Sequence, residues 1–321
     1  MIPPKLKEGD EIRIISPAES MAMIADDQRD LAIQRFKQMG LTISFSQHAY
    51  NENAAIEQRV SDIHDAFRDP EVKAILTTIG GYNSNQLLQY LDYELIAENP
   101  KILCGFSDIT ALANAIYKKT GLVTYSGPHF STFGMEKGIE YTEEYFKKMF
   151  LNSNPVDINP ANHWSDDKWF MDQENRCFHL HEGYAVIHEG RAEGISMGGN
   201  LCTLNLLQGT EYMPPLEGKV LFLEDDFLTN VPTFDRDLQS LIHQPHFDQV
   251  RGLVIGRFQK ASNISLHDLT QIIHSKPELS RIPVVAEASF GHTTPQFTFP
   301  IGGEVSLEAK AEKVTVTITH H

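Results

Sequence analysis

The sequence lacks the features typical of a membrane or secreted protein. No apolar run approaches the ~20 residues that a bilayer-spanning helix needs. The first ten residues have neither the apolar core nor the cleavage site of a signal peptide. Three cysteines (Cys104, Cys177 and Cys202) are odd in number and far apart, so they suggest no disulfide framework. We therefore expect a cytoplasmic protein.

Basic residues and metal-ligand spacings are also scarce. The chain has 27 basic and 43 acidic residues, a net charge of −16, and no basic cluster. This balance argues against nucleic-acid and anionic-membrane partners, although it is compatible with one nucleotide held by stacking. The closest histidine pairs, His179 with His181 and His243 with His246, lack a third ligand at a metal-site spacing. We expect neither a metal nor a cofactor.

The pattern of strands and helices indicates an α/β protein with two domains. The chain of 321 residues is 41% apolar and 22% charged, as in a globular protein of that size. Five apolar strands alternate with helices of 10–15 residues over the first 125 residues, which predicts a parallel sheet. They are expected at 11–16, 41–45, 72–78, 102–104 and 121–125. We assign residues 1–150 to a Rossmann-like, flavodoxin-like domain, whose ligands should lie at the carboxyl edge of the sheet.

The alternation stops between the two predicted domains. Residues 151–183 are polar and contain both tryptophans, Trp164 and Trp169, so we predict a linker with a functional loop. Residues 184–321 predict a second α/β domain. Its strands are expected at 184–187, 219–223, 252–256 and 282–286, and its end is β-rich, with a barrel-like part.

One stretch of the first domain, residues 101–112, has the pattern of a nucleophile elbow. A short apolar strand runs into Gly105-Phe106-Ser107-Asp108, and an amphipathic helix follows. A serine at such a turn is exposed at the carboxyl edge of the sheet, close to the N–H groups of the new helix. The alternative is an ordinary helix N-cap. The full G-x-S-x-G pattern is absent, because Ile109 occupies its fifth position.

A serine nucleophile needs a base and a group that orients the base, and position selects the candidates here. His292 lies in a loop just past an apolar strand, and Glu224 ends another such strand. The ends of strands are where clefts form in α/β proteins, which favours both residues over the many polar residues on helix faces. Asp225 and Asp226 compete with Glu224 as the orienting acid.

A pair of glycines, Gly80 and Gly81, follows the third strand. Glycine permits close approach of the backbone, so an N–H group here can point at a developing oxyanion. The alternative is a plain tight turn. A phosphate-binding loop is disfavoured because neither G-x-G-x-x-G nor a P-loop Lys-Ser/Thr is present.

Taken together, these motifs resemble the S66 serine peptidases, the LD-carboxypeptidase family. The resemblance is spread along the chain, in the segments 14–17, 79–81, 105–108, 198–201, 223–225, 291–292 and 300–302. It implies a triad with Ser107 as nucleophile, His292 as base and Glu224 as orienting acid, and an oxyanion hole made by the N–H groups of Gly81 and Asp108. It also implies a homodimer that needs no metal.

Two branches of that family fit the chain differently. The LD-carboxypeptidases, which trim murein tetrapeptide in cell-wall recycling, commonly carry an Arg-Gly-Gly-Tyr-Gly-type loop, whereas this chain has Ile79-Gly-Gly-Tyr-Asn-Ser-Asn85. That loop resembles more closely the microcin C self-immunity branch, which hydrolyses aspartyl or sulfamoyl adenylates. The resemblance implies substrate contacts from Asn83 and Ser84, and adenine stacking by Trp164 or Trp169. The alternative for the tryptophans is packing of the loop on its own domain.

A different class of protein also has to be considered, a non-catalytic two-domain protein that closes on a small ligand. Such a binder needs no ordered set of serine, glutamate and histidine at strand ends. The presence of all three favours an enzyme that acts on an aminoacyl adenylate analogue or a muropeptide.

Overall fold

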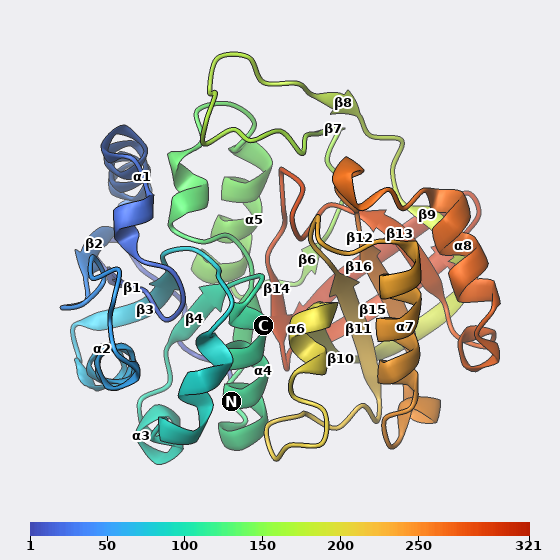
Figure 1. Ribbon diagram of the computed structural model, residues 1–321, viewed down its shortest axis with the longest axis horizontal. Coiled ribbons are helices and arrows are strands. Elements are labelled where there is room, and N and C mark those ends of the chain that lie inside the picture. Colours follow the sequence, from blue (N-terminus) through green and yellow to red (C-terminus); the bar gives the residue numbers. More distant parts are fainter.

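Two open β-sheets, covered by helices, stand next to each other in the computed structural model, which describes residues 1–321 (Figure 1). The first sheet has the order β14-β5-β4-β3-β1-β2, and its strands β1 to β5 are mutually parallel. The 2-1-3-4-5 order is that of flavodoxin-like sheets, in which ligands bind beyond the carboxyl ends of the strands. The expected fold class of the first domain is confirmed.

The elements of this first half follow the predicted alternation. The strands are β1 (Glu11–Ile15), β2 (Thr42–Phe45), β3 (Val72–Thr77), β4 (Ile102–Gly105) and β5 (Thr124–Ser126). The helices are α1 (Asp26–Gln38), α2 (Ile56–Arg68), α3 (Tyr93–Glu98), α4 (Ile109–Thr120) and α5 (Glu140–Leu151). Short 3-10 turns are η1 (Met21–Met23), η2 (Ser84–Tyr90) and η3 (Ser131–Gly134).

The second sheet has eight strands in the order β6-β16-β15-β10-β11-β12-β13-β9. Its parallel centre is β10 (Gly190–Asn200), β11 (Lys219–Glu224), β12 (Gly252–Gly256) and β13 (Val284–Ala288). Antiparallel neighbours flank this centre: β6 (Val156–Asp157), β9 (Ala185–His188), β15 (Glu304–Lys310) and β16 (Lys313–His320). The sheet runs from one edge strand to the other, so the expected barrel-like part is an open sheet without closure.

Three helices and three 3-10 turns belong to this half: α6 (Leu201–Asn205), α7 (Val231–Ile242), α8 (Leu266–His274), η4 (Phe247–Gln249), η5 (Lys260–Ser262) and η6 (Pro277–Leu279). Their starts are set by side chains. Asn200, Asn230 and Ser265 each accept a hydrogen bond from the backbone N–H three residues later. None of the protein's helices has the length and apolar character that crossing a membrane requires.

The first sheet takes one edge strand from the second half of the chain, and the second sheet takes one from the linker. β14 (Phe299–Ile301) pairs with β5 of the first sheet, and β6 pairs with β16 of the second. The two halves are therefore joined by strand pairing as well as by the linker. The domain limits 1–150, 151–183 and 184–321 stay a prediction.

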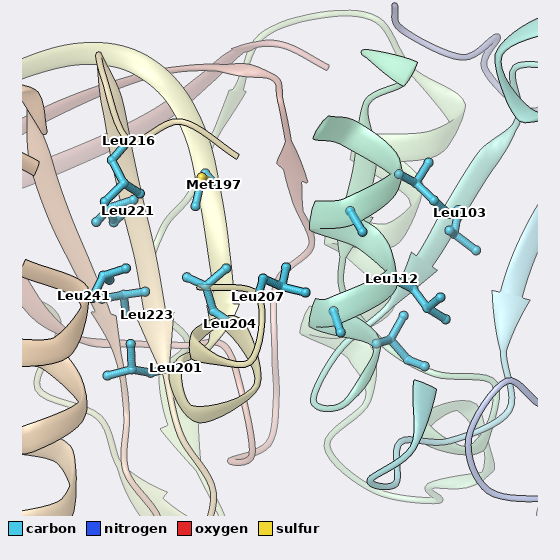
Figure 2. Packing of buried hydrophobic residues seen from close by; sticks show 14 of the residues in the cluster. Leu103, Leu112, Met197, Leu201, Leu204, Leu207, Leu216, Leu221, Leu223 and Leu241 are labelled. Atoms are coloured by element: carbon cyan, nitrogen blue, oxygen red, sulfur yellow. The ribbon is translucent and has the colours of Figure 1, made fainter. Parts of the chain in front are cut away.

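The hydrophobic core also crosses from one half to the other. Two clusters of 40 and 39 buried residues each contain side chains from both sheets. In Figure 2, Leu103 and Leu112 lie on one side and Leu204 and Leu207 on the other. Burying apolar area on both sides of one boundary stabilises the relative position of the two sheets.

Polar contacts fix helix α4 against the second half. The Asn114 amide donates to the Gly198 carbonyl at 2.9 Å, and the Asn200 N–H donates to the Thr110 hydroxyl at 3.0 Å. At Gly199, where φ is +124°, a Cβ would come within 2.5 Å of the Thr110 hydroxyl oxygen. The Gly198-Gly199-Asn200 segment thus docks the helix that follows Ser107 onto the sheet that carries Glu224.

Candidate active site

Ser107 lies in a strained turn between β4 and α4. Its φ is +59°, a left-handed conformation that side chains other than glycine rarely adopt. α4 begins at Ile109, with Asp108 as its N-cap residue, so Ser107 precedes the helix and is not its cap. A cap role, the alternative raised by the sequence, therefore does not explain the serine.

Gly105 permits this turn by close approach to the neighbouring strand. A Cβ on Gly105 would lie 2.2 Å from the Thr77 hydroxyl oxygen of β3. No side chain fits in that space, so the residue two before Ser107 has to be glycine. Packing of β4 on β3 thereby fixes where the turn ends and where Ser107 stands.

The structure brings Ser107, His292 and Glu224 together from three separate elements. The Ser107 Oγ lies 3.0 Å from His292 Nε2, and His292 Nδ1 lies 2.7 Å from Glu224 Oε2. Glu224 is the last residue of β11 and is 2% exposed, while His292 lies in the loop after β13. At Gly291, where φ is +94°, a Cβ would lie 2.4 Å from Glu224 Oε2, so this glycine lets the loop rest on the carboxylate.

The electrostatics around His292 favour its protonated form. Burial of the ring lowers its pKa, but the charge and hydrogen bond of Glu224, with smaller contributions from Asp226 and Asp225, outweigh burial and raise the pKa above its usual value. An imidazole that holds a proton more readily is a stronger base toward a neighbouring hydroxyl.

The competing acids have other partners. Asp225 accepts a hydrogen bond from the Asn200 amide at 3.2 Å, and burial together with the nearby Glu224 raises its pKa to about 7. Asp226 accepts the backbone N–H of Leu228 at 2.8 Å and lines the cleft in front of Ser107. Of the three acids in this run, Glu224 is the one that hydrogen-bonds His292.

The backbone N–H groups of Gly81 and Asp108 donate to no acceptor inside the protein. Gly81 follows β3 and lines the cleft with Gly80, which packs on Ser107. Ser84 ties this loop to the elbow: its N–H donates to the Asp108 carboxylate at 2.9 Å, and its hydroxyl donates to the Asp108 carbonyl at 2.8 Å. Burial raises the pKa of Asp108, and the hydrogen bonds from Ser84 oppose that rise.

The two polar residues predicted to contact substrate do not reach the cleft. Ser84 is fully buried beneath the loop, with its hydroxyl used by Asp108, and Asn83 is exposed outside the cleft lining. Asn83 is the residue before the 3-10 turn η2, and Ser84 is its first residue. The backbone of this turn sets the direction of both side chains, and the sequence motif alone does not specify that direction. Ser84 therefore holds the Gly80-Gly81 loop in place, and substrate contact by Asn83 and Ser84 stays a prediction.

A cleft with a volume of about 500 Å³ lies in front of Ser107 and His292. The segment 165–170 forms part of its wall and is fixed at both ends. Ser165 and Thr294 exchange backbone hydrogen bonds of 2.7 and 2.8 Å, and the Gln28 amide donates to the Phe170 carbonyl at 2.9 Å. The tryptophan-containing segment thus spans from the His292 loop to α1, above both sheets in Figure 1.

The two tryptophans have different surroundings. Trp169 lines the cleft beside Phe170. Trp164, in the two-stranded ribbon of β7 (His163–Trp164) and β8 (His179–Leu180), packs against the Arg257 guanidinium at 4.6 Å and the Lys260 ammonium at 5.4 Å. Trp169 is therefore available to a ligand in the cleft, whereas Trp164 anchors the segment to the second half.

Several cleft residues were not predicted from the sequence. Phe106, His129, Ser131, Thr132 and Gln296 all line the cleft. His129 follows β5, so the end of an apolar strand was a signal for it, as for Glu224 and His292. Phe106 lies in the Ser107 turn itself. Ser131, Thr132 and Gln296 come from turns whose direction depends on the packing of η3 against α1 and of the segment after His292.

Comparison with known protein families matches both halves of the chain. The description "LD-carboxypeptidase N-terminal domain" matches residues 12–127, and "LD-carboxypeptidase C-terminal domain" matches residues 193–307. The chain belongs to the S66 peptidase family. It is accordingly a serine peptidase or amide hydrolase, and the recognition made from the sequence motifs is confirmed.

Some relatives of this chain are named as carboxypeptidases, and one is named as a microcin self-immunity protein. YocD of Bacillus subtilis (strain 168), named a candidate carboxypeptidase, is 56% identical over 99% of both chains. The microcin C7 self-immunity protein MccF of Escherichia coli is 31% identical over 84% of this chain and 80% of its own. A murein tetrapeptide carboxypeptidase of Pseudomonas aeruginosa is 28% identical over 92% of both.

Solved structures of MccF-type proteins share the fold. A crystal structure of an MccF-like protein from Bacillus anthracis str. Ames superposes with a TM-score of 0.98, at 56% identity over all of both chains. MccF in complex with aspartyl sulfamoyl adenosine superposes with a TM-score of 0.90, at 28% identity over 100% of this chain and 99% of that one.

Proposed function

We propose that this S66 hydrolase cleaves an amide bond with a catalytic triad of Ser107, His292 and Glu224. The observation that carries the proposal is the continuous contact from Ser107 Oγ to His292 Nε2 at 3.0 Å and from His292 Nδ1 to Glu224 Oε2 at 2.7 Å. Nucleophile, base and orienting acid at hydrogen-bond distance are what acyl transfer to a serine requires.

The reaction follows from these contacts. His292 Nε2 accepts the Ser107 hydroxyl proton as Oγ attacks the carbonyl carbon, and the oxyanion is stabilised by the unused N–H groups of Gly81 and Asp108. Glu224 holds the Nδ1–H of His292 and stabilises the imidazolium. His292 then gives the proton to the leaving nitrogen, and a water activated by the same imidazole hydrolyses the acyl-serine.

For the substrate we propose an aminoacyl sulfamoyl nucleotide or a related aminoacyl adenylate, aspartyl derivatives foremost. MccF, a relative at 31% identity, has been solved with aspartyl sulfamoyl adenosine. In this chain, Trp169, Phe170 and Phe227 provide aromatic surface in the cleft, suited to stacking on a nucleobase. Trimming of murein tetrapeptide is the second candidate, because a relative carries that name.

Turnover of aspartyl sulfamoyl adenosine and murein tetrapeptide, measured with one enzyme preparation, tests this proposal. We expect faster cleavage of the nucleotide, and loss of hydrolysis with retained binding in Ser107→Ala. Preferential cleavage of the tetrapeptide would favour the second candidate. Binding of either ligand without any hydrolysis would indicate a non-catalytic binder. The expected homodimer stays a prediction, which sedimentation of the purified protein can test.

A further inference from the structure

One wall of the cleft consists of buried, uncharged polar side chains that the proposed triad does not use. His129, Ser131, Thr132 and Gln296 line the cleft, and their exposed fractions are 2%, 8%, 6% and 3%. Polar side chains buried this deeply normally have hydrogen-bond partners. The Nε2 atom of His129 is fully buried and has no partner in the protein.

The free nitrogen of His129 lies close to the nucleophile. A Cβ placed on Gly80 would be 3.1 Å from the Ser107 Oγ and 3.6 Å from His129 Nε2, so both atoms border the same point beside the glycine. The Phe106 ring holds the His129 ring by stacking, with centroids 4.3 Å apart. An unpartnered buried polar group is destabilising, so its position beside Ser107 indicates that a ligand supplies the partner.

The other ring nitrogen fixes which hydrogen faces the cleft. His129 Nδ1 lies 2.7 Å from the Thr77 hydroxyl, whose other acceptor, the Cys104 carbonyl, is 3.4 Å away. We assign the Thr77 proton to the contact with Nδ1, the shorter of the two, because hydrogen bonds weaken as they lengthen. With Nδ1 accepting, the proton of the neutral ring is on Nε2, and the cleft is offered an N–H donor.

This donor stays uncharged while His292 works. Burial and the nearby His292 lower the pKa of His129 to about 3. His129 thus adds no positive charge beside the imidazolium that forms on His292, and it does not titrate in the range where His292 does. It can therefore donate to an oxygen atom throughout the range in which His292 titrates.

We propose that the Nε2–H of His129 donates a hydrogen bond to a carboxylate or carboxamide oxygen on the acyl half of the substrate, which makes His129 a specificity-determining residue. The proposal rests on the proposed amide hydrolysis. The leaving group needs His292 Nε2 for its proton, so it lies toward His292, and the free nitrogen beside Gly80 is left for the acyl half. Ser131, Thr132 and Gln296 extend the same polar wall.

The test measures binding without turnover, in the Ser107→Ala background, of aspartyl and alanyl sulfamoyl adenosine. Adding His129→Leu should weaken binding of the aspartyl compound roughly 10- to 150-fold, the range for losing a hydrogen bond to a charged group. Binding of the alanyl compound should change less than about 3-fold. Adding His129→Gln should restore most of the aspartyl affinity, because the Gln amide can donate from a similar position.

His181 supplies the matched control. Its Nδ1 contacts the Ala161 carbonyl at 2.7 Å and its Nε2 is also buried without a partner, but it lies outside the cleft. His181→Leu should leave the ratio of the two affinities unchanged. Thr77→Val removes the hydroxyl that contacts His129 Nδ1, and it should lower the ratio of the two affinities. If His129→Leu has an altered melting curve, the affinity ratio of Thr77→Val is the test of the role of His129.

The outcomes separate this inference from the proposed function. Equal weakening of both ligands by His129→Leu, or no weakening, overturns the role of His129. Selective weakening together with no hydrolysis by the wild-type enzyme supports the acyl contact and overturns the proposed function. Failure of both ligands to bind Ser107→Ala overturns both. In the active background, His129→Gln should keep the acid midpoint of its pH–rate profile, and a shifted midpoint would contradict a neutral donor.

Discussion

The half of the molecule that carries Ser107 and the half that carries Glu224 and His292 hold their side chains by different means. Ser107 is positioned by its own backbone, through a φ of +59° and the close approach of Gly105 to β3. His292 and Glu224 are positioned by each other, through a 2.7 Å hydrogen bond between residues 68 positions apart. The first arrangement is local and is visible in a motif, whereas the second exists only after the second sheet has folded.

Docking of the two halves joins these arrangements. Thr110 and Asn114 on α4 hydrogen-bond the Gly198–Asn200 segment, which is the end of β10, the strand paired with β11 and Glu224. A site divided this way depends on the boundary between halves as much as on its own residues. Variants of the two residues that meet across the boundary are expected to have the largest effects. Variants of the residues that position them, or that contact substrate, are expected to have smaller ones.

The largest effect is expected from removing the two residues that meet across the boundary. Ser107→Ala and His292→Ala should each lower turnover by roughly 10⁴-fold or more. The double variant should be no slower than the singles by more than about 10-fold, because residues that act as a unit give non-additive losses. Steady-state rates of the three variants check this. A double variant with the product of the two single losses would mean that the residues act independently.

Glu224→Gln tests the support on the second half. It should lower turnover by roughly 10²- to 10⁴-fold, because the amide no longer fixes and stabilises the imidazolium. Wild-type kcat/KM should fall as the pH drops through the raised pKa of His292, since only the neutral ring accepts the Ser107 proton. Without the carboxylate that raises this pKa, the acid midpoint should move to lower pH.

Asp225→Asn is the matched comparison for Glu224→Gln. Asp225 is equally buried but hydrogen-bonds Asn200, so its loss should be the smaller one. A pH–rate profile of each variant supplies the measurement. If Glu224→Gln kept both the rate and the midpoint while Asp225→Asn lost them, Asp225 would be the orienting acid.

The tryptophans test the substrate side of the comparison. Trp169→Ala should lower kcat/KM about 5- to 150-fold on aspartyl sulfamoyl adenosine and hardly change it on a substrate without a base, because stacking contributes ~1–3 kcal/mol per base. Trp164→Ala should show no such selectivity, since its ring packs on Arg257. If neither variant discriminates between the substrates, the nucleotide proposal is wrong.

The smallest expected effect is a loss of stability from a change at the boundary between the two halves. Gly199→Ala should destabilise the protein by about 1–3 kcal/mol more than Gly209→Ala, because its Cβ meets the Thr110 hydroxyl whereas Gly209 has open space around it. The φ of Gly199 is +124° and that of Gly209 is +74°, so backbone strain adds to the larger loss expected at Gly199. Urea unfolding checks the difference. Equal stability losses would show that the contact with α4 adds nothing.

The same contrast explains what the sequence could predict. The strands of the first sheet and the Ser107 turn follow from local patterns, the apolar runs and the glycine-serine motif, and they lie within a few residues of their predicted positions. The strand β10 was missed because its early residues alternate glycine and charged residues, and it gains its stability from pairing with β11 and β15. α5 was missed although its buried face contains Phe146, Met149 and Phe150.

In the site, single strand ends indicated Glu224 and His292 as candidates. Their mutual contact depends on folding of the second sheet, and the contact of His292 with Ser107 depends on the packing of two sheets. The choice between Trp164 and Trp169 could not be made from sequence, because it is set by the positions of Arg257 and the Ser165–Thr294 pairing. His129 was overlooked because its significance comes from one unpartnered nitrogen beside Gly80, a property of three-dimensional packing.

Ser107 is proposed to be a nucleophile that His292 activates across the boundary between the two halves, and labelling with a serine-directed fluorophosphonate tests this directly. After labelling, peptide mass spectrometry should place one adduct on Ser107 of the wild-type protein. The adduct should be absent from Ser107→Ala and should form far more slowly in His292→Ala. An adduct on another serine, or equally fast labelling without His292, would contradict the proposed triad.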